Sequence, residues 1–475
     1  MIRLGPEGWR GVIAEEITVA SVRRVASAIA RVLANSSRGR RGVLIGFDTR
    51  FLSERFAREA AAAVAAHGVP AHLSPAPVPT PALAFAVRAG KRAGGIIVTA
   101  GDGPAEHSGL RLCVADGGAA RPEILRAIEG LANEPGPGTA PGAASRSRAR
   151  RGVPRASRAR PPDLRADYLK QIGRLVRLRA VRRAGLDVAC DPRRGAAIGY
   201  LDAMLARACR TVETIHAAAH PAFENGGPDC GERNLRPLAR LVRRRRLALG
   251  LATDGEGGRF GIIDSGGHFI PPNPFLALLA DYLIERRGLE GGVARTVATT
   301  HLIDAVCAQH GRTVYETPLG FESLGGLLAS GRAFLACEES GGLGLHGHVP
   351  ERDGILAGLL ATEMVAARRR SLRDQVRDLF ARIGPVHGRR IDYHTDPGTR
   401  ERLLRRLEEI PAVFAGKRTA RCDTTDGSKR IFADGSWILF RVPAGDPVIR
   451  CYIEARTTKD VEALTAAARL LITGS

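Results

Sequence analysis

Short apolar runs alternate with segments of helical spacing along the first two-thirds of the chain. Residues 43–48 (VLIGFD) and 94–100 (GGIIVTA) are apolar runs of strand length, and runs of this kind indicate buried strands of a parallel sheet. Between them, residues 53–67 repeat apolar side chains at the spacing of a helix. Because strands and helices alternate, this part of the chain predicts an α/β layer.

The alternation continues in two later parts of the chain. Residues 186–192 (LDVACDP) and 247–256 (LALGLATDGE) predict strands of a second α/β unit. A third unit begins at 291–300 (GGVARTVATT) and continues through 332–342 (RAFLACEESGG) to a helix around 353–368. We therefore expect three similar α/β domains.

The C-terminal part follows a different pattern. Residues 399–410 have helical spacing, whereas 436–440 (SWILF) and 449–455 (IRCYIEA) are short β segments that precede a final helix. This pattern predicts a smaller α+β domain. The expected division of the chain is a first domain at 1–132, a linker at 133–162, and further domains at 163–260, 261–370 and 371–475.

The predicted linker contains much of the chain's positive charge. Pro, Gly, Ala, Ser and Arg dominate residues 133–162, which is typical of a linker, and helical spacing resumes at Tyr168. The formal net charge is +22, and 14 Arg or Lys against two Asp fall within residues 145–184. Only five of the 71 basic residues are lysine, and aromatic side chains that stack on bases are nearly absent from this segment. The charge therefore favours a solvated basic linker over nucleic-acid binding. An interaction protein that uses residues 145–184 is an alternative hypothesis.

Composition excludes several classes of protein. With 44% hydrophobic and 25% charged residues in a chain of 475, the protein is neither disordered, nor fibrous, nor a small disulfide scaffold. No apolar stretch is long enough to cross a membrane, and the start MIRLGP lacks the apolar core of a secretory signal. Eight scattered cysteines without a CxxC pattern indicate reduced thiols. We expect a cytoplasmic protein without a membrane partner; the sequence carries no signal for an oligomeric state.

Two Gly-rich loops follow predicted core strands, which is where open α/β sheets bind ligands. The first comprises residues 99–104 (TAGDGP). The second comprises residues 254–259 (DGEGGR), in which Asp254 and Glu256 offer the hard oxygen ligands that Mg²⁺ prefers. The second loop is one carboxylate short of a protein-held ion, so an ordinary acidic turn is the alternative.

Two further loops carry candidate polar groups. Residues 338–342 (EESGG) present carboxylates and a hydroxyl that suit the hydroxyls of a sugar ring, or equally the N-cap of a helix. Residues 441–447 (RVPAGDP) form a turn in which Arg441 could meet a phosphate.

In this order and spacing, the four loops resemble those of the α-D-phosphohexomutase family, the phosphoglucomutases and phosphomannomutases. The resemblance covers nearly the whole chain and implies three α/β domains and a C-terminal phosphate-binding domain around a central cleft. The stretches that carry it are 8–11 (GWRG), 47–50 (FDTR), 79–83 (PTPAL), 251–255 (LATDG), 298–304 (ATTHLID), 315–318 (YETP) and 338–354.

The resemblance also implies a reaction, and the first loop departs from its pattern. In the family, a phosphorylated serine passes its phosphoryl group to a hexose phosphate while Mg²⁺ offsets the developing charge. The serine position is Gly101 here, which has no side chain to phosphorylate, and Asp102 replaces the neighbouring histidine. The implied catalytic set also contains Arg10 and Arg111. Arg111 replaces a lysine, and the pKa of arginine is too high for acid–base work at neutral pH.

The remaining implied site residues show further departures. The implied metal ligands are Asp254 and Glu256, and Gly258 removes the third carboxylate, so the Mg²⁺ site is degraded. In the phosphate loop, Arg441 is kept, but Pro443 and Gly445 replace the hydroxyl donors. The implied substrate-binding residues are Arg259, Glu338, Ser340, His348 and Glu322, the last of which stands in place of a lysine.

Losses on the phosphoryl-transfer loops and an intact sugar loop lead to two further hypotheses. The first is a family member that is inactive as a mutase and binds a hexose phosphate weakly through Glu338 and Ser340. The second is an active mutase in which Asp102 accepts the phosphoryl group as an acyl phosphate.

Overall fold

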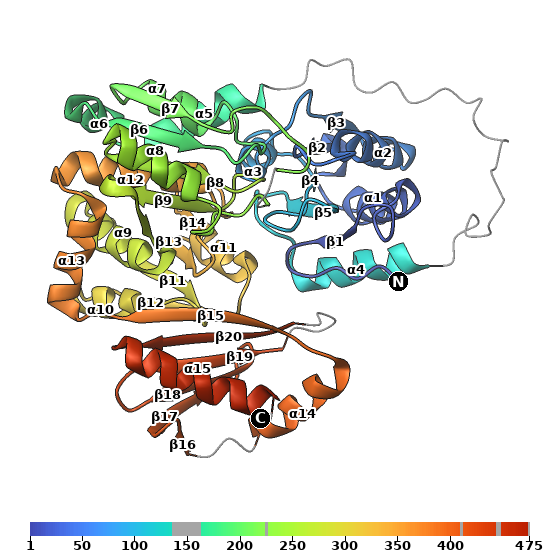
Figure 1. Cartoon of the computed structure of the whole chain (residues 1–475). Coiled ribbons are helices and arrows are strands. Elements are labelled where there is room, and N and C mark those ends of the chain that lie inside the picture. Colours follow the sequence, from blue (N-terminus) through green and yellow to red (C-terminus); the bar gives the residue numbers. More distant parts are fainter. Residues whose placement is uncertain (135–162, 224–226, 409–411, 443–447, 474–475) are drawn as a thin grey trace. The chain divides into compact units, whose positions relative to one another are not determined.

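The first α/β domain is built on a five-stranded sheet in the order β1-β5-β4-β2-β3 (Figure 1). The apolar runs of the sequence become β2 (Val43–Phe47) and β4 (Gly94–Val98), which pair in parallel and are buried throughout. The short β3 (Ala71–Leu73) extends the parallel part. On the other side, β5 (His107–Val114) and β1 (Trp9–Val12) pair antiparallel. The computed structural model describes residues 1–134, 163–223, 227–408, 412–442 and 448–473.

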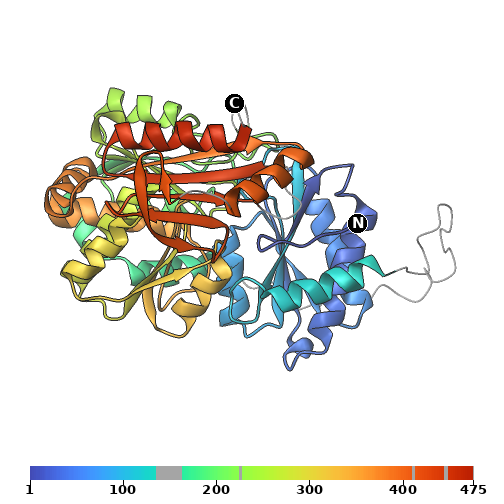
Figure 2. The same cartoon turned by 90° about the horizontal axis from the view of Figure 1, so that it is seen from below.

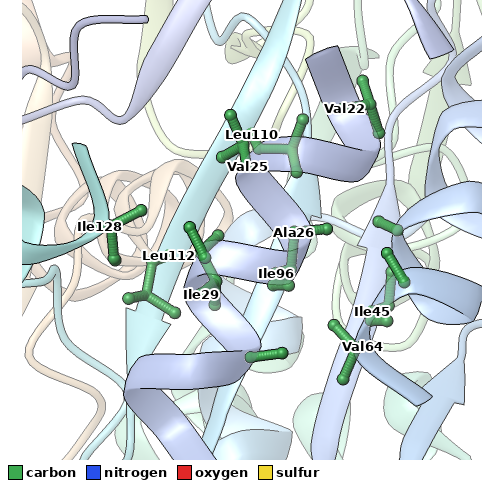
Figure 3. Packing of buried hydrophobic residues seen from close by; sticks show 14 of the residues in the cluster. Val22, Val25, Ala26, Ile29, Ile45, Val64, Ile96, Leu110, Leu112 and Ile128 are labelled. Carbon is green, nitrogen blue, oxygen red and sulfur yellow. The ribbon is translucent and has the colours of Figure 1, made fainter. Parts of the chain in front are cut away.

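Helix α1 (Val19–Ala34) supplies much of the core of this domain (Figure 3). Val22, Val25, Ala26 and Ile29 recur at helical spacing, so they share one face and pack against the sheet. The helix begins at a capping box between Thr18 and Ser21. The other helices of the domain are α2 (Ser53–Ala66), α3 (Thr80–Ala89) and α4 (Pro122–Asn133).

The second α/β domain repeats this plan in a sheet of order β10-β9-β8-β6-β7. The parallel strands are β6 (Asp187–Asp191), β7 (Thr211–Thr214) and β8 (Leu249–Thr253). The antiparallel strands β9 (Phe260–Asp264) and β10 (His268–Ile270) follow. The helices of the domain are α5 (Leu164–Leu175), α6 (Leu178–Ala184), α7 (Leu201–Ala206) and α8 (Arg236–Arg245).

The chain divides into two compact units, residues 1–272 with 320–373 and residues 273–319 with 374–475. The first unit also holds the hairpin of β13 (Ala333–Glu338) and β14 (Gly342–Leu345). The flanking helices of this hairpin are α11 (Phe321–Ala329) and α12 (Gly354–Arg368).

The second unit contains a parallel strand pair and a larger antiparallel sheet. The pair is β11 (Gly292–Thr296) with β12 (Val314–Thr317). The sheet has the order β15-β20-β19-β18-β17-β16, and α15 packs against β15 and β20 (Figure 2). The helices of this unit are α9 (Pro272–Arg287), α10 (Leu302–Gln309), α13 (Leu372–Ile383), α14 (Pro397–Glu408) and α15 (Thr458–Thr473). The sheet strands are β15 (His387–His394), β16 (Val413–Phe414), β17 (Lys417–Asp423), β18 (Ser428–Phe432), β19 (Trp437–Arg441) and β20 (Val448–Ala455).

Most of the strands and helices expected from the sequence are present, whereas the expected domain boundaries stay predictions. The eight cysteines are free thiols. Of the helices in the described residues, none is both long and apolar enough to span a membrane. Helix α4 ends at Asn133, and residues 135–162 of the expected linker lie outside the described residues. The domain boundaries at 132, 162, 260 and 370 stay predictions.

Candidate functional site

The loop after β4 places Gly101 directly beside the guanidinium of Arg10. Gly101 has a left-handed φ of +61°, and its N–H donates to Thr99 Oγ1 at 3.0 Å. A Cβ built on Gly101 would lie 2.7 Å from Nη2 of Arg10 and 3.3 Å from Oε1 of Glu256. The guanidinium of Arg10, which projects from β1, therefore occupies the space beside the loop.

Arg50, a buried residue that the sequence did not assign to the site, donates hydrogen bonds to the same loop. Arg50 pairs with Asp48 at 3.0 Å, and both side chains are fully buried. Its Nη2 donates to the carbonyls of Gly101 and Gly103 at 2.8 Å each. Burial lowers the pKa of Arg50, and Asp48 opposes that shift. The signal in the sequence was the Phe47-Asp48-Thr49-Arg50 stretch, whose role only these carbonyl contacts define.

The loop after β8 brings Glu256 toward the first domain. Oε2 of Glu256 accepts a hydrogen bond from Thr80 Oγ1 at 2.9 Å, and its backbone carbonyl accepts one from the Thr80 N–H at 2.9 Å. Thr80 opens helix α3, within the stretch 79–83 that carries part of the resemblance. Nη1 of Arg111, on β5, lies 3.7 Å from Oε1 of Glu256. Glu256 is therefore engaged by two groups of the first domain.

Arg111 is buried between carboxylates. Besides Glu256, it forms a short ion pair with Glu351. Burial by itself disfavours the charge of Arg111, but Glu351, Glu7 and Glu256 outweigh that effect and raise its pKa. Arg111 is therefore a permanently charged partner of carboxylates, which fits an electrostatic role and excludes acid–base work.

The site also contains three charged residues that were not predicted as site residues from the sequence: Arg352, Glu7 and Glu351. Arg352 Nη1 lies 3.3 Å from Oε2 of Glu338, its Nη2 pairs closely with Glu7, and its Nε lies 3.5 Å from Glu351. Glu7 in turn pairs with Arg10 at 3.2 Å. Because Arg352 and Glu7 are 345 positions apart in the chain, only the tertiary fold reveals the pair.

Asp102 joins this set through arginines. Its carboxylate forms a short ion pair with Arg259 and lies 3.9 Å from Arg10, with 33% of the side chain exposed. The result is one connected network of four arginines and five carboxylates. Its members are Arg10, Arg111, Arg259, Arg352, Glu7, Asp102, Glu256, Glu338 and Glu351. With all groups ionised, the arginines are fully matched by the protein's own carboxylates.

The pKa values of three side chains reflect this crowding. Burial raises the pKa of Glu338 to about 7, although Arg352 lowers it. Burial, and then the neighbouring Glu256, raise the pKa of Asp254 to about 7. Burial, and then Arg352, lower the pKa of Arg259 to about 10. Two carboxyl groups of the site thus change charge near neutral pH.

The residues at the expected Mg²⁺ position do not fit a protein-held ion. Asp254 has one carboxylate oxygen, Oδ2, without a hydrogen-bond partner in the described residues, while Oδ1 accepts from the Gly258 N–H at 2.8 Å. Glu256 is engaged by Thr80 and Arg111, and Gly258 offers no side chain. Across the residues that the structure describes, no group of three His, Cys, Asp or Glu could hold a metal. With a single free protein oxygen, most of the octahedral positions around Mg²⁺ would have to be filled by water or by a ligand's phosphate, so the chain's own residues do not form a metal cage.

The residues of the expected sugar loop differ from one another in burial and in their partners. Glu338 ends β13, and Ser340 lies half-buried in the turn before β14. His348 is fully buried and its Nε2 lies 2.8 Å from Asp353, to which Tyr168 also donates a hydrogen bond at 2.7 Å. Glu322 is half-buried in the first turn of α11. The structure therefore places Glu338 in the ion-pair network and His348 in the interior.

The expected phosphate loop belongs to the second unit. Arg441 ends β19, and its Nε pairs with Oδ1 of Asp426 at 3.0 Å. Gly445 lies outside the described residues. Like Arg10 and Arg259, Arg441 is neutralised by a carboxylate of the chain itself.

Comparisons with known proteins agree on one family. The family models for phosphoglucomutase/phosphomannomutase α/β/α domains I, II and III match residues 1–137, 166–267 and 271–383. A phosphoglucomutase/phosphomannomutase of Thermococcus kodakarensis is 26% identical over 453 residues, which cover 95% of this chain and 94% of that protein. Human phosphoglucomutase-like protein 5 is 30% identical over 270 residues, covering 50% of this chain and 47% of that protein.

A solved structure extends the likeness to the whole chain. The crystal structure of a Thermus thermophilus protein, assigned as a phosphomannomutase, is 33% identical, covers 99% of both chains and superposes with a TM-score of 0.83. The chain belongs to the α-D-phosphohexomutase family, with three α/β domains and a C-terminal β-rich domain. The predicted family and fold class are confirmed.

Proposed function

We propose that this chain is a phosphohexomutase-family protein that does not turn over hexose phosphates and retains a sugar-binding loop. The observation that carries the proposal is Gly101. At the position of the family's nucleophile there is no oxygen to phosphorylate, and the guanidinium of Arg10 fills the adjoining space.

The ion-pair network supports the same proposal. A phosphate dianion is held by arginines whose charge is free for it. Here Arg10, Arg259 and Arg111 are each paired with carboxylates of the chain. A phosphate would have to displace those carboxylates, so we expect weak phosphate binding and no support for phosphoryl transfer.

The decisive experiment is a coupled mutase assay on the full chain. Glucose 1-phosphate and mannose 1-phosphate are supplied with glucose 1,6-bisphosphate and Mg²⁺, with a working mutase of the family as positive control. We expect no turnover above background. Robust turnover by the unmodified chain would contradict the proposal.

The residual ligand class we propose is a hexose phosphate bound weakly through Glu338 and Ser340. Two related structures, both of Aspergillus fumigatus N-acetylphosphoglucosamine mutase, hold glucose 1,6-bisphosphate or GlcNAc-6P. Saturation-transfer NMR with glucose 6-phosphate tests this, and the signal should fall in Glu338→Gln. The exposed Glu106→Gln is the matched control.

A second candidate is a mutase that uses Asp102, because this carboxylate is partly exposed and flanked by Arg10 and Arg259. Such an enzyme would incorporate phosphate from glucose 1,6-bisphosphate as a hydroxylamine-sensitive acyl phosphate. Incorporation that disappears in Asp102→Asn would favour this candidate over the inactive protein. Absence of incorporation would exclude it.

A further inference from the structure

Arginines cluster at the edge of the second sheet where its parallel strands begin. Each of β6, β7 and β8 is preceded by arginines at the end of a helix or in the turn after it. Since β7-β6-β8 are neighbours in the sheet, the three clusters lie along one edge. We call this edge the arginine rim; it comprises Arg182, Arg183, Arg207, Arg210, Arg243, Arg244, Arg245 and Arg246, all exposed.

The rim lies away from the candidate site. The loop with Asp254 and Glu256 follows the carboxyl end of β8, whereas Arg243 to Arg246 precede its amino end. The α8 cluster lies on one face of the sheet. On the other face α6 packs with α12, as Val181, Ala208 and Ala366 form one apolar cluster there. The rim therefore spans the thickness of the domain.

Among the residues that the structure describes, two rim arginines pair with a carboxylate. Arg210 pairs with Asp187, and Arg245 pairs with Glu213 at 2.9 Å. Arg182 donates to the carbonyl of Arg207 at 3.0 Å, a contact that leaves both guanidinium charges uncompensated. In the described part of the chain, eight arginines thus face two carboxylates, a surplus of six positive charges.

Helix termini explain part of this pattern but not all of it. Basic residues in the last turn of a helix interact favourably with its dipole. That effect does not explain Arg246, which ends α8 with a left-handed φ of 53°, a position at which glycine is the cheaper residue. Arg246 therefore adds a fourth positive charge to Arg243, Arg244 and Arg245, although its left-handed backbone conformation is unfavourable for a residue other than glycine.

The rim contains no large exposed hydrophobic residue of the described chain, and this limits the kind of partner that it can bind. Stable protein interfaces centre on apolar or aromatic anchors, and membrane-surface helices insert an apolar face. The large exposed hydrophobic residues of the described chain are Met1, Phe51, Leu404, Val413 and Leu470, none of them in the rim. The apolar face of α8, with Leu238, Leu241 and Val242, is buried in the domain. The rim therefore offers a partner only positive charge, carried by guanidinium groups whose forked N–H donors match the geometry of phosphate.

We propose that the arginine rim binds the phosphodiester backbone of a nucleic-acid duplex without sequence preference. Adjacent strands are about 4.8 Å apart and flanking helices about 10 Å further out, so the rim extends for roughly 20 Å. Over that length a duplex presents about twelve phosphates. Backbone contacts carry no sequence information, and the rim has no aromatic side chains to stack single-stranded bases. This proposal differs from the basic-linker hypothesis because six of the eight rim arginines, all except Arg182 and Arg183, lie outside residues 145–184, and it is independent of the proposed function.

The test is fluorescence anisotropy of the full chain with two labelled duplexes of unrelated sequence, between about 50 and 200 mM NaCl. We expect equal affinity for both duplexes and a linear fall of log K with log salt, at about −0.9 per phosphate contact. The variant Arg183→Ala/Arg243→Ala/Arg244→Ala/Arg246→Ala should reduce that slope by three to four and weaken binding about a hundredfold or more at low salt.

A matched variant removes four exposed arginines of the first domain instead, namely Arg3, Arg40, Arg55 and Arg121, each to Ala. It has the same net charge as the rim variant and should bind like the unmodified chain. Thermal melting should show both variants folded. In the rim variant, relief of like-charge repulsion offsets the lost interaction of Arg243 and Arg244 with the α8 dipole, so its Tm should stay close to that of the unmodified chain.

Three results would overturn the proposal. Equal loss in both variants would show that net charge alone is responsible. Loss on substitution of the seven arginines at 146–160, with the rim variant unaffected, would assign the binding to that segment. Binding of polyglutamate or phosphatidylserine vesicles but not of duplexes would assign the rim to an acidic protein or a membrane.

Discussion

At the scale of single residues, Gly101 shows what a sequence reveals and what it leaves out. The missing hydroxyl is evident from the sequence. That the guanidinium of Arg10 lies beside Gly101, and that Glu256 and Asp102 lie against arginines, follows only from the tertiary structure. The glycine that the resemblance places at the nucleophile position is thus surrounded by ion pairs of the chain's own side chains.

The variant Gly101→Ser should therefore not restore mutase activity. Its Cβ would meet Nη2 of Arg10 at 2.7 Å, and a side chain at φ +61° is strained. We expect a loss of about 1–2 kcal/mol in unfolding free energy and no turnover in the coupled assay. Urea unfolding measures the first quantity. Gly130→Ser, where a Cβ meets no atom within 4 Å in helix α4, is the matched control and should be neutral. Turnover by Gly101→Ser would show that the other loops remain competent.

At the scale of elements, a buried lysine joins β18 to the β11–β12 region within the second unit. Nζ of Lys429 donates to the carbonyl of Val297 at 2.6 Å, lies 3.3 Å from Glu316, and stands 4.4 Å from the ring centroid of Trp437. Burial lowers the pKa of Lys429 to about 8, although Glu316 opposes the shift. Burial also lowers the pKa of His301 to about 2, so its ring is neutral beside the ammonium.

The stability of this unit should rise with pH above 8. Because the folded protein releases the Lys429 proton near pH 8 and the unfolded chain near 10.5, the unfolded chain binds more protons between these values. Unfolding free energy should therefore increase over that interval, by up to about 3 kcal/mol. The intrinsic fluorescence of Trp437 should titrate near pH 8 in a Trp9→Phe background, which leaves Trp437 as the sole tryptophan.

Lys429→Met should abolish both effects, whereas the exposed Lys459→Met should preserve them. A fluorescence midpoint near pH 8 that persists in Lys429→Met would assign the titration to another group.

The elements themselves were largely predictable, and the exceptions have a common cause. The apolar runs at 43–48, 94–100 and 186–192 became β2, β4 and β6, because a strand buried on both faces needs apolar side chains throughout. The strands β1 and β5 were not expected. Their pairing is antiparallel and depends on contacts between residues about a hundred positions apart, such as Trp9 with Leu110. Local periodicity carries no information about such partners.

At the scale of the whole molecule, the expected Mg²⁺ position offers one free carboxylate oxygen in the described residues, Oδ2 of Asp254, while Glu256 is engaged by Thr80 and Arg111. We therefore expect the Tm of the full chain to be the same, within about 1 °C, in 10 mM MgCl₂ and in EDTA, since a ligand stabilises only in proportion to its occupancy. Differential scanning fluorimetry measures this, with NaCl of equal ionic strength as the control. An increase specific to Mg²⁺ and lost in Asp254→Asn would establish a metal site that the geometry does not favour.

The sequence by itself determined the family, the succession of α/β domains and the glycine at the position that the resemblance assigns to the nucleophile. These properties are local: strand and helix periods, Gly-rich loops, and the residue at one position. The tertiary structure decided that Arg352 meets Glu7 and Glu338, that Arg50 holds the carbonyls of Gly101 and Gly103, and that the arginines before three strands form one rim. The reason is that charge acts through space, so its balance at a site depends on which distant segments the fold brings together.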